Sequence, residues 1–227
     1  MIKYLLSITY TMNFLNTILD IIFPVYCISC RKNGIDLCLE CLSNCSPAEY
    51  GDYKWIYPIF DYRDPLVKKS IWLLKYKSKK RLGSIFAEII YGRIMEELSD
   101  LMVFENFKNP ILIPIPLAPK RKRERGFNQA EVICNELIQL DKNENFKLEN
   151  NILIKQKDTK HQASIKNRSE RLKNLINSFT IKNPEKIKNK NIILIDDVST
   201  TGATLNEAKK ILKQAGAKKV IAFAIAH

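Results

Sequence analysis

The chain has 227 residues, which is enough for one sizeable domain and a small additional module. Its hydrophobic content of 46% supports a packed core and excludes a globally disordered chain. Lys and Arg number 37 against 24 Asp and Glu, which favours polyanionic partners such as nucleic acid, phosphorylated ligands or an anionic membrane surface. An AT-rich genome would also raise the lysine content. Because the basic excess is spread along the chain, these two explanations carry equal weight.

The first 23 residues are apolar but are interrupted by polar residues, Asp20 among them. The one basic residue of this segment is Lys3, and no small-residue cleavage site precedes the cysteines, so a secretory signal peptide does not fit. The segment is also too interrupted for a transmembrane helix, and we expect no stable membrane insertion. We expect residues 1–23 to contribute an N-terminal helix, with its body at residues 13–23. Met12 is an alternative start of the chain.

Five of the six cysteines fall within one short segment, whereas a disulfide scaffold would spread them over the chain. We therefore expect a reducing, cytoplasmic compartment and a metal site, with the isolated Cys134 in the core. Two C-x-x-C turns can aim four thiolates at one tetrahedral, structural Zn²⁺, and a [4Fe–4S] cluster is the alternative. Cys45 is a fifth thiol that could be a spare or could replace one ligand, and it is left outside the ligand set. The predicted zinc-ribbon module spans residues 24–50, and its ligands are Cys27, Cys30, Cys38 and Cys41.

The region that follows the cysteines alternates between strand-like and helix-like spacing of apolar residues. We expect a strand over residues 54–60, helices over 65–77 and 83–98, a buried strand over 111–117 and an amphipathic helix over 126–140. Because proline cannot donate a ladder hydrogen bond, the prolines of the buried strand predict that it ends there.

Basic residues and two aromatic rings alternate over residues 68–83. Single-stranded nucleic acid binds to basic grooves that carry stacking rings, which makes this stretch a candidate contact surface. The alternative is an amphipathic helix with its lysines in solvent, and we expect Trp72 to lie in the core in this way. The candidate nucleic-acid contacts are Lys75, Tyr76, Lys77, Lys79, Lys80 and Arg81.

The second half of the chain continues the alternation of strands and helices. We expect strands over residues 151–156, 179–182, 191–198 and 218–227, and a helix over 203–216 that Gly216 ends. Strand, helix and strand in this order, with aliphatic strands, predict an α/β fold with a mostly parallel sheet flanked by helices on both faces.

The stretch NIILIDDVSTTGATL ends a buried strand with two adjacent acids, followed by hydroxyl residues and a glycine. Ligands of open α/β sheets bind beyond the carboxyl ends of the strands. The N–H groups at the start of the next helix attract a phosphate, and Gly202 permits its close approach. Asp196 and Asp197 can each accept hydrogen bonds from a sugar diol. An ordinary polar helix cap would need only one Ser or Thr. The pattern therefore predicts a ribose 5-phosphate site with phosphate contacts at Ser199, Thr200, Thr201, Gly202, Ala203 and Thr204.

This stretch resembles the loop that binds phosphoribosyl pyrophosphate (PRPP) in type I phosphoribosyltransferases. The resemblance implies that Asp196 and Asp197 are the catalytic acids, that they hold the ribose hydroxyls, and that Mg²⁺ accompanies PRPP. Purine-salvage members carry an acid three residues after the second Asp, where this chain has Thr200. A purine acceptor is therefore less favoured, and no general base is identified.

An earlier strand end, PIPLAPKRKRERGFNQAEV at residues 114–132, is the second candidate loop. Its turn could hold the pyrophosphate of PRPP, with the basic residues 120–125 nearby. A solvated basic turn before a helix is the common alternative. The candidate pyrophosphate contacts are Pro116, Leu117, Ala118 and Arg125.

Four segments in combination are similar to the ComF family of competence-type, phosphoribosyltransferase-like proteins. They are CISCRKNGIDLCLEC, which resembles the family's zinc finger, DYRDPLVKKSIWLLKYK, the PxPL…RERGFNQA loop and DTKHQASIKNRSERLKN. The polar residues 157–170, which include His161, correspond to the loop that closes over PRPP in this fold. The resemblance covers about residues 13–227. It implies a type I phosphoribosyltransferase fold for residues 51–227, PRPP with Mg²⁺, and a role in DNA uptake during natural transformation.

These observations lead to two functional hypotheses. The first is a PRPP-binding, phosphoribosyltransferase-like protein that handles incoming single-stranded DNA in the cytoplasm, with competence proteins such as a helicase as further partners. The second is a catalytically active phosphoribosyltransferase that transfers the pentosyl group to a nucleobase or another small acceptor in nucleotide salvage. Salt-sensitive binding of single-stranded DNA distinguishes the first, and steady pyrophosphate release on adding an acceptor distinguishes the second.

Overall fold

The computed structural model describes residues 24–49, 53–156 and 178–227. The helix expected over residues 13–23 and the segment with His161 lie outside the described residues. No helix within the described ranges is long and apolar enough to cross a membrane. The chain divides between Asn44 and Cys45 into two compact units, which are described one at a time. The division expected at residue 50 stays a prediction.

The smaller unit is built from two tight turns and one short helix. Its first turn is closed by hydrogen bonds from Cys27 N to Lys32 O and from Gly34 N to Val25 O, each 2.8 Å long. The second ends in helix α2 (Leu39–Ser43). Among residues 24–44 the buried aliphatic side chains are Leu37 and Leu42, so a cross-link between the turns would help this part of the chain to hold its shape.

The larger unit is organised around a five-stranded parallel sheet in the order β1-β7-β6-β2-β3. Its strands are β1 (Ile56–Phe60), β2 (Ile111–Pro114), β3 (Lys147–Leu148), β6 (Asn191–Val198) and β7 (Lys219–Ala226). A second, antiparallel pair consists of β4 (Leu153–Lys155) and β5 (Phe179–Ile181), followed by the short 3-10 helix η2 (Pro184–Lys186).

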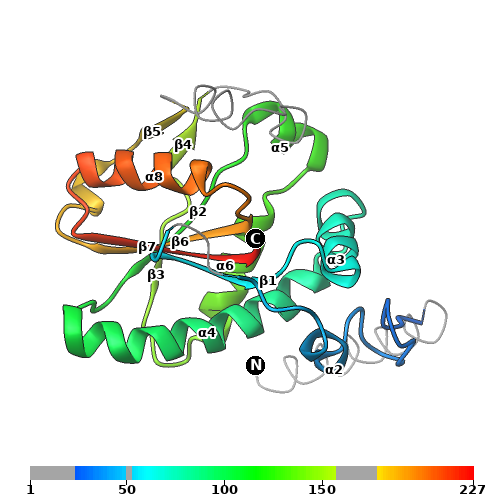
Figure 1. Ribbon diagram of the computed structural model, residues 1–227. Helices are drawn as coiled ribbons and strands as arrows, with labels where there is room; N and C mark the ends of the chain where they lie inside the picture. The colour runs from blue at the N-terminus through cyan, green and yellow to red at the C-terminus, as the bar shows by residue number, and fades with distance from the viewer. Residues whose placement is uncertain (1–23, 50–52, 157–177) are drawn as a thin grey trace, which may run out of the picture. The chain divides into compact units, whose positions relative to one another are not determined.

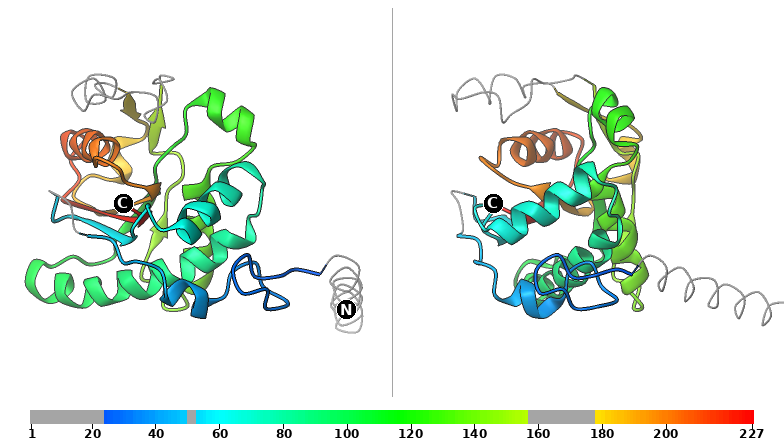
Figure 2. Two further views of the ribbon diagram at one scale, coloured as in Figure 1. Left: turned by 45° about the vertical axis from the view of Figure 1, so that its right-hand side comes forward. Right: turned by 90° about the vertical axis from the view of Figure 1, so that its right-hand side faces the viewer.

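Helices cover both faces of the sheet, which confirms the predicted α/β architecture (Figures 1 and 2). Helix α8 (Ala203–Gln214) packs on one face and also contacts β5. Helices α4 (Arg81–Glu105) and α6 (Gln129–Leu140) pack against each other on the opposite face. Helix α3 (Pro65–Tyr76) precedes α4, and the seven-residue helix α5 (Pro119–Arg125) follows β2. The connections from β1 to β2, from β2 to β3 and from β6 to β7 each contain an α-helix, as is usual between parallel strands.

The central strand β6 shows why the sheet is buried on both sides. Its residues Ile192 to Ile195 are fully buried, and side chains on a strand alternate between the two faces. Ile192 and Leu194 belong to the core under α8, together with Leu205, Ala208 and Leu212 of that helix. Ile193 and Ile195 therefore face the α4 and α6 layer. This alternation also decides where the acids that end the strand point.

Two differences from the sequence prediction have local causes. The helix expected over residues 126–140 is two helices, because Gly126 ends α5 in the left-handed region at a φ of 77° and Asn128 then caps α6. The Asn128 side chain accepts a hydrogen bond from Ala130 N and donates one to Ile115 O. It thereby fixes the residues after β2 to the start of α6. Helix α4 extends to Glu105, beyond the expected residue 98, and ends at left-handed Asn106.

Candidate functional site

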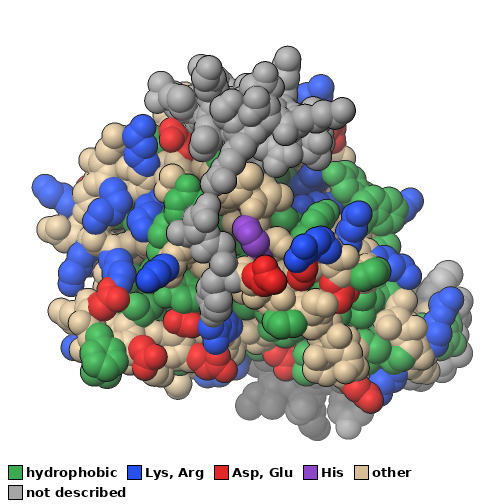
Figure 3. Space-filling view, viewed as in Figure 1, with side chains coloured by type: hydrophobic (Ala, Val, Ile, Leu, Met, Phe, Trp, Pro, Cys, Tyr) green, Lys and Arg blue, Asp and Glu red, His purple; other side chains and the backbone are tan. Residues whose placement is uncertain are grey.

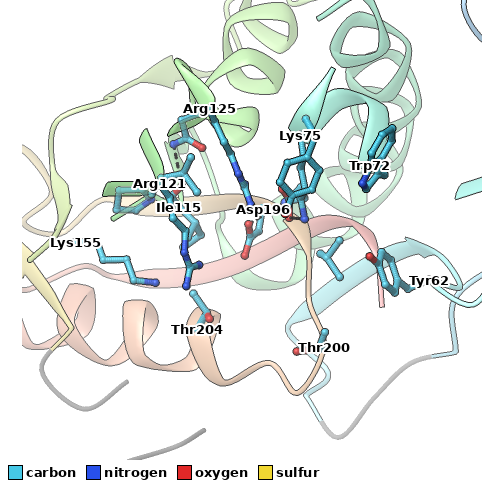
Figure 4. A pocket seen from close by; sticks show the side chains of 16 residues that line it. Tyr62, Trp72, Lys75, Ile115, Arg121, Arg125, Lys155, Asp196, Thr200 and Thr204 are labelled. Atoms are coloured by element: carbon cyan, nitrogen blue, oxygen red, sulfur yellow. Dashed lines mark hydrogen bonds and ion pairs between the residues drawn. The ribbon is translucent and has the colours of Figure 1, made fainter. Parts of the chain in front are cut away.

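A cleft with a volume of about 290 Å³ lies beyond the carboxyl ends of β2 and β6 in the larger unit (Figure 4). Open α/β sheets bind their ligands at this edge. Side chains from α3, α5, β4, β6 and the loop before α8 surround it. Its polar lining residues are Tyr62, Lys75, Tyr76, Arg121, Arg125, Asn128, Lys155, Asp196, Asp197, Thr200 and Thr204.

The two adjacent acids reach this cleft from opposite faces of β6. Asp196 continues the series of Ile192 and Leu194 that faces α8, so Asp197 must begin on the side of α4 and α6. Both nevertheless line the cleft, because the strand ends there. Asp197 Oδ1 lies 2.8 Å from Lys75 Nζ of α3, with both side chains largely buried. Asp196 Oδ1 accepts a hydrogen bond from the backbone N–H of Asp197.

Asp196 is the most electrostatically perturbed carboxyl of the cleft. Burial raises its pKa from 3.8 to about 7, and the neighbouring charge of Asp197 acts in the same direction. Lys75 and Lys155 lower the pKa but do not cancel this effect. A buried acid with a pKa near neutrality is common at functional sites, because a bound ligand supplies the hydrogen bonds or positive charge that the free protein lacks.

The loop between β6 and α8 has the geometry of an anion site. Gly202 adopts the left-handed conformation at a φ of 68°, and a Cβ there would lie 2.7 Å from the ring of Tyr53. Both facts require glycine. A small hollow beside the main cleft is lined by Ser199, Thr200, Gly202, Ala203 and Thr204. Thr201 lines neither space. The N-terminal end of α8, a twelve-residue helix, favours a negative charge there.

Ser199 supplies a second sign of a ligand at this loop. The residue is buried, yet its Oγ has no hydrogen-bond partner among the described residues. A buried hydroxyl without a partner costs free energy, and a phosphate oxygen at the hollow would relieve that cost.

His227, directly after β7, contacts the same loop, although nothing in the sequence pattern singled it out. Its Nδ1 lies 2.6 Å from Ser199 O, and its own carbonyl accepts a hydrogen bond from Tyr62 N. The loop is therefore fastened at Ser199 and again where Gly202 packs on Tyr53. The contact with His227 crosses 28 residues of sequence, so no local pattern could have revealed it.

The candidate pyrophosphate residues are only partly at the cleft. Pro116, Leu117 and Arg125 line it, whereas Ala118 is buried and serves as the N-cap of α5. The expected turn over residues 114–125 is therefore a short loop followed by a helix. Arg125 Nη1 donates to Gln129 Oε1 at 2.9 Å, which orients the guanidinium toward the cleft mouth.

Lys155 is a cleft residue that the sequence analysis did not single out. It comes from β4, outside the main sheet, and its side chain is only 7% exposed, with Nζ 5.2 Å from the centroid of the Phe179 ring. Figure 4 shows it opposite Lys75, on the other side of Asp196. The cleft thus combines two carboxylates with cations from three separate elements.

The candidate nucleic-acid residues fall into two groups. Lys75 and Tyr76 line the cleft, whereas the four basic residues Lys77, Lys79, Lys80 and Arg81 do not. The expectation that Trp72 lies in the core was wrong: its side chain is 48% exposed and borders the cleft. The buried face of α3 is made by Val67, Ser70, Ile71 and Leu74, and Trp72 lies off that face. Figure 3 shows basic side chains in the region of α3, and the sequence of α5 is itself rich in lysine and arginine.

The smaller unit gathers four cysteines at one point. Their sulfur atoms all lie within 4.8 Å of one another, and the residues are Cys27, Cys30, Cys38 and Cys41. Three of the Sγ–Sγ distances are 3.6, 3.8 and 3.9 Å. A tetrahedral zinc with bonds of about 2.3 Å separates its sulfur ligands by about 3.8 Å, so the cluster fits such an ion. Cys45 and Cys134, as expected, are not members.

Comparison with known proteins defines the class first. A family model described as the phosphoribosyl transferase domain matches residues 125–227, which include α6, the β6 acids and the α8 loop. Over most of its length the chain is 32% identical to competence protein ComFC of Streptococcus pneumoniae, covering 88% of this chain and 79% of the relative. It is 34% identical to competence protein F of Haemophilus influenzae, and the match covers 90% of this chain and 85% of that protein. DNA utilization protein YhgH of Escherichia coli O157:H7 is 24% identical to the chain, and the match covers 81% of this chain and 74% of that protein.

The chain carries a phosphoribosyltransferase-type domain. It belongs to the ComFC/competence protein F family, as the resemblance in its motifs indicated.

Proposed function

We propose that this protein binds PRPP with Mg²⁺ in the cleft at the carboxyl edge of its sheet, and that it uses this site while handling single-stranded DNA during natural transformation. The observation that supports the proposal best is the convergence of Asp196 and Asp197 with the anion-binding loop before α8 in one cleft. A sugar diol and a 5-phosphate need these two kinds of group side by side.

Each part of PRPP has candidate partners in the larger unit. The 5-phosphate would take the hollow of the α8 loop, which Ser199 and the first residues of α8 line, and it could accept a hydrogen bond from Ser199 Oγ. The ribose hydroxyls would donate to Asp196 and Asp197, and the proton on Asp196 near neutral pH would then be lost. The pyrophosphate would lie toward Arg125 and the residues after β2.

Mg²⁺ fits the same place. It is a hard cation that prefers carboxylate, water and phosphate oxygens, and Asp196 and Asp197 are the carboxylates of the cleft. The ion would neutralise charge on the pyrophosphate. The chain's own residues would fix the sugar and exclude water, so any rate enhancement would come from positioning and from stabilisation of the positive charge that develops at C1.

Turnover is a separate question from binding. The place where purine-salvage enzymes carry an acid is Thr200, which is exposed at the cleft and cannot act as a base at neutral pH. We therefore propose PRPP binding, rather than catalytic turnover, as the primary role of this site. Steady release of pyrophosphate on adding a nucleobase would show that the salvage hypothesis is the better one.

The DNA-handling half of the proposal rests on the family and on charge. Relatives are named competence proteins and a DNA utilization protein, and helices α3 and α5, which border the cleft, carry several lysine and arginine residues. A phosphate backbone would be attracted to that surface, and the affinity would fall steeply with salt. We place this work in the cytoplasm, beside other competence proteins such as a helicase, with a structural Zn²⁺ on the four-cysteine cluster.

Titration calorimetry of zinc-loaded protein with PRPP and Mg²⁺ tests the binding site. We expect saturable binding at one site per chain, which Asp197→Ala removes. The matched control is Asp100→Ala on the exposed side of α4, which takes away an acid far from the cleft and should leave the affinity unchanged. No binding to the wild-type protein at millimolar PRPP, or equal binding by both variants, would contradict the proposal.

A further inference from the structure

Two large aromatic rings stand exposed at the mouth of the cleft. Trp72 and Tyr76 are 48% and 51% exposed, and they lie four residues apart on one face of α3. Their ring centroids are 6.0 Å apart with an angle of 42° between the planes. Neither ring belongs to the buried face of the helix. Both line the same cleft as Asp197, so their open surface faces the space that leads to the acids.

A cation lies over each of these two rings. Lys77 Nζ lies 5.6 Å from the centroid of the Trp72 ring, and the guanidinium carbon of Arg125 lies 5.1 Å from that of Tyr76. Arg125 Nη2 also donates to the Tyr76 hydroxyl at 3.3 Å. A ring that is fixed by a cation on one side is a ready stacking surface on the other, since little side-chain entropy remains to be lost.

The cleft continues from these rings into a second basic hollow. This hollow has a volume of about 290 Å³ and shares Lys75, Tyr76, Arg121 and Arg125 with the main cleft. Three of its lining residues are cationic and one, Glu124, is acidic. A ligand that lies along both spaces therefore meets aromatic rings and positive charge in alternation. Free nucleobases would use the rings but have no charge for the cations.

We propose that Trp72 and Tyr76 form a stacking platform for a base of single-stranded nucleic acid, whose phosphates lie in the basic hollow between α3 and α5. A single strand offers base faces and negative charge at a regular spacing, whereas a duplex hides its base faces and an acidic peptide has few rings. The inference rests on the proposed function and deepens it, because it places the strand and PRPP in one continuous cleft.

The two ligands would meet at Lys75. This residue borders both spaces, precedes Tyr76 in the chain and forms the ion pair with Asp197. A base on Tyr76 would therefore lie next to the group that holds one of the ribose-binding acids. Binding of a strand should change the affinity for PRPP, and by linkage PRPP should change the affinity for the strand by the same factor.

The chain contains a convenient reporter for the platform. It has two tryptophans, Trp55 and Trp72. Trp55 is not part of the platform: Lys209 Nζ lies 3.9 Å from the centroid of its ring, and its side chain packs against the core under α8. A Trp55→Phe protein leaves Trp72 as the only tryptophan. Titration with a single-stranded oligothymidylate should quench its fluorescence, because stacking brings a base onto the indole. An abasic strand of the same length and charge should bind more weakly and leave the fluorescence nearly unchanged.

Variants separate stacking from charge. Trp72→Ala and Tyr76→Ala should each weaken oligonucleotide binding, measured by anisotropy of a labelled strand, by roughly five- to a hundredfold. Tyr76→Phe keeps the ring and should stay near the wild-type affinity. Phe104→Ala is the matched control, because Phe104 is 81% exposed on α4 but does not line either space; it should have no effect.

Equal quenching by the abasic strand, or an unchanged affinity of both alanine variants, would overturn the platform. Salt-sensitive binding would then be purely electrostatic. Calorimetry with PRPP on the same proteins keeps this result apart from the proposed PRPP site. Trp72→Ala removes a ring whose contacts are with Tyr76 and Lys77, so it should still bind PRPP, and loss of strand binding with intact PRPP binding refers to the platform alone.

Discussion

Replacement of Asp196 by Asn should make the ligand-free protein more stable at alkaline pH while it removes PRPP binding. The folded protein holds this carboxyl in a half-buried place beside Asp197, and its pKa is raised from 3.8 to about 7. Between these two values the folded state binds a proton that the unfolded chain has already released. The free energy of unfolding therefore falls as the pH rises through this window, and the contribution of neutral Asp196 is lost above it.

The size of the effect follows from the shift. A rise of the Asp196 pKa from 3.8 to about 7 corresponds to a free energy of about 4 kcal/mol as an upper limit, since each tenfold change in proton affinity is worth about 1.4 kcal/mol. Water at the open cleft and rearrangement of nearby Lys75 and Lys155 would reduce this value, and we expect a gain of about 1–3 kcal/mol for Asp196→Asn above about pH 8. At about pH 5 the folded acid is protonated whereas the unfolded carboxyl is already largely ionised, so somewhat over a third of the difference, about 0.4–1 kcal/mol, should be present there.

Urea unfolding of zinc-saturated protein at both pH values, without PRPP or Mg²⁺, measures this difference. The comparison at about pH 5 is the internal control, because a packing change that the amide itself causes adds the same amount at both pH values, whereas the contribution of the carboxyl grows with pH. A variant that is less stable than wild type above about pH 8, or a difference that is the same at both pH values, would refute the reasoning that Asp196 is kept at an electrostatic cost for the sake of a ligand.

Three further variants test other parts of the account. Cys41→Ser should reduce bound zinc, measured by atomic absorption, from one ion per chain to a small fraction, whereas Cys134→Ser should leave it unchanged. Gly202→Ala should destabilise the fold by about 1–3 kcal/mol in thermal unfolding and weaken PRPP binding at least tenfold, because of its left-handed backbone and the clash with Tyr53. Ser199→Ala should leave the free energy of unfolding unchanged or raise it by about 1 kcal/mol, since it deletes a buried hydroxyl that has no partner among the described residues, yet it should weaken PRPP binding in calorimetry. Each argument has an outcome that would contradict it: full zinc content in Cys41→Ser, wild-type PRPP affinity in Gly202→Ala, or a loss of stability in Ser199→Ala.

The parts of the site that were predictable from sequence are those encoded within a few residues of one another. The acids and the loop that follows them run without a break from a strand into a helix, so the aliphatic pattern of β6 located Asp196 and the position of Gly202 at once. The same holds for the cysteines, whose spacing alone predicted the cluster that the structure forms. The parallel sheet followed from the order of strands and helices.

The other parts of the site depend on tertiary contacts. Lys155 reaches the cleft only because β4 pairs with β5 outside the main sheet, and His227 reaches Ser199 only because β7 lies beside β6. Trp72 was misjudged for a different reason. Apolar residues at helical spacing usually indicate a buried face. In α3 that face is made by Val67, Ser70, Ile71 and Leu74 without the Trp72 indole, which lies exposed at the cleft. An exposed aromatic ring of this kind becomes informative only once its surroundings are known.

A crystal structure of the protein with Mg²⁺ and PRPP would test the central claim most directly. The account predicts the 5-phosphate in the hollow of the α8 loop, in contact with Ser199 Oγ and the N–H groups that follow Gly202, with the ribose hydroxyls on Asp196 and Asp197. The pyrophosphate should extend toward Arg125. PRPP bound elsewhere, or a cleft that stays without ligand at saturating PRPP while Lys75 keeps its contact with Asp197, would contradict the assignment of this edge of the sheet as a phosphoribosyl site.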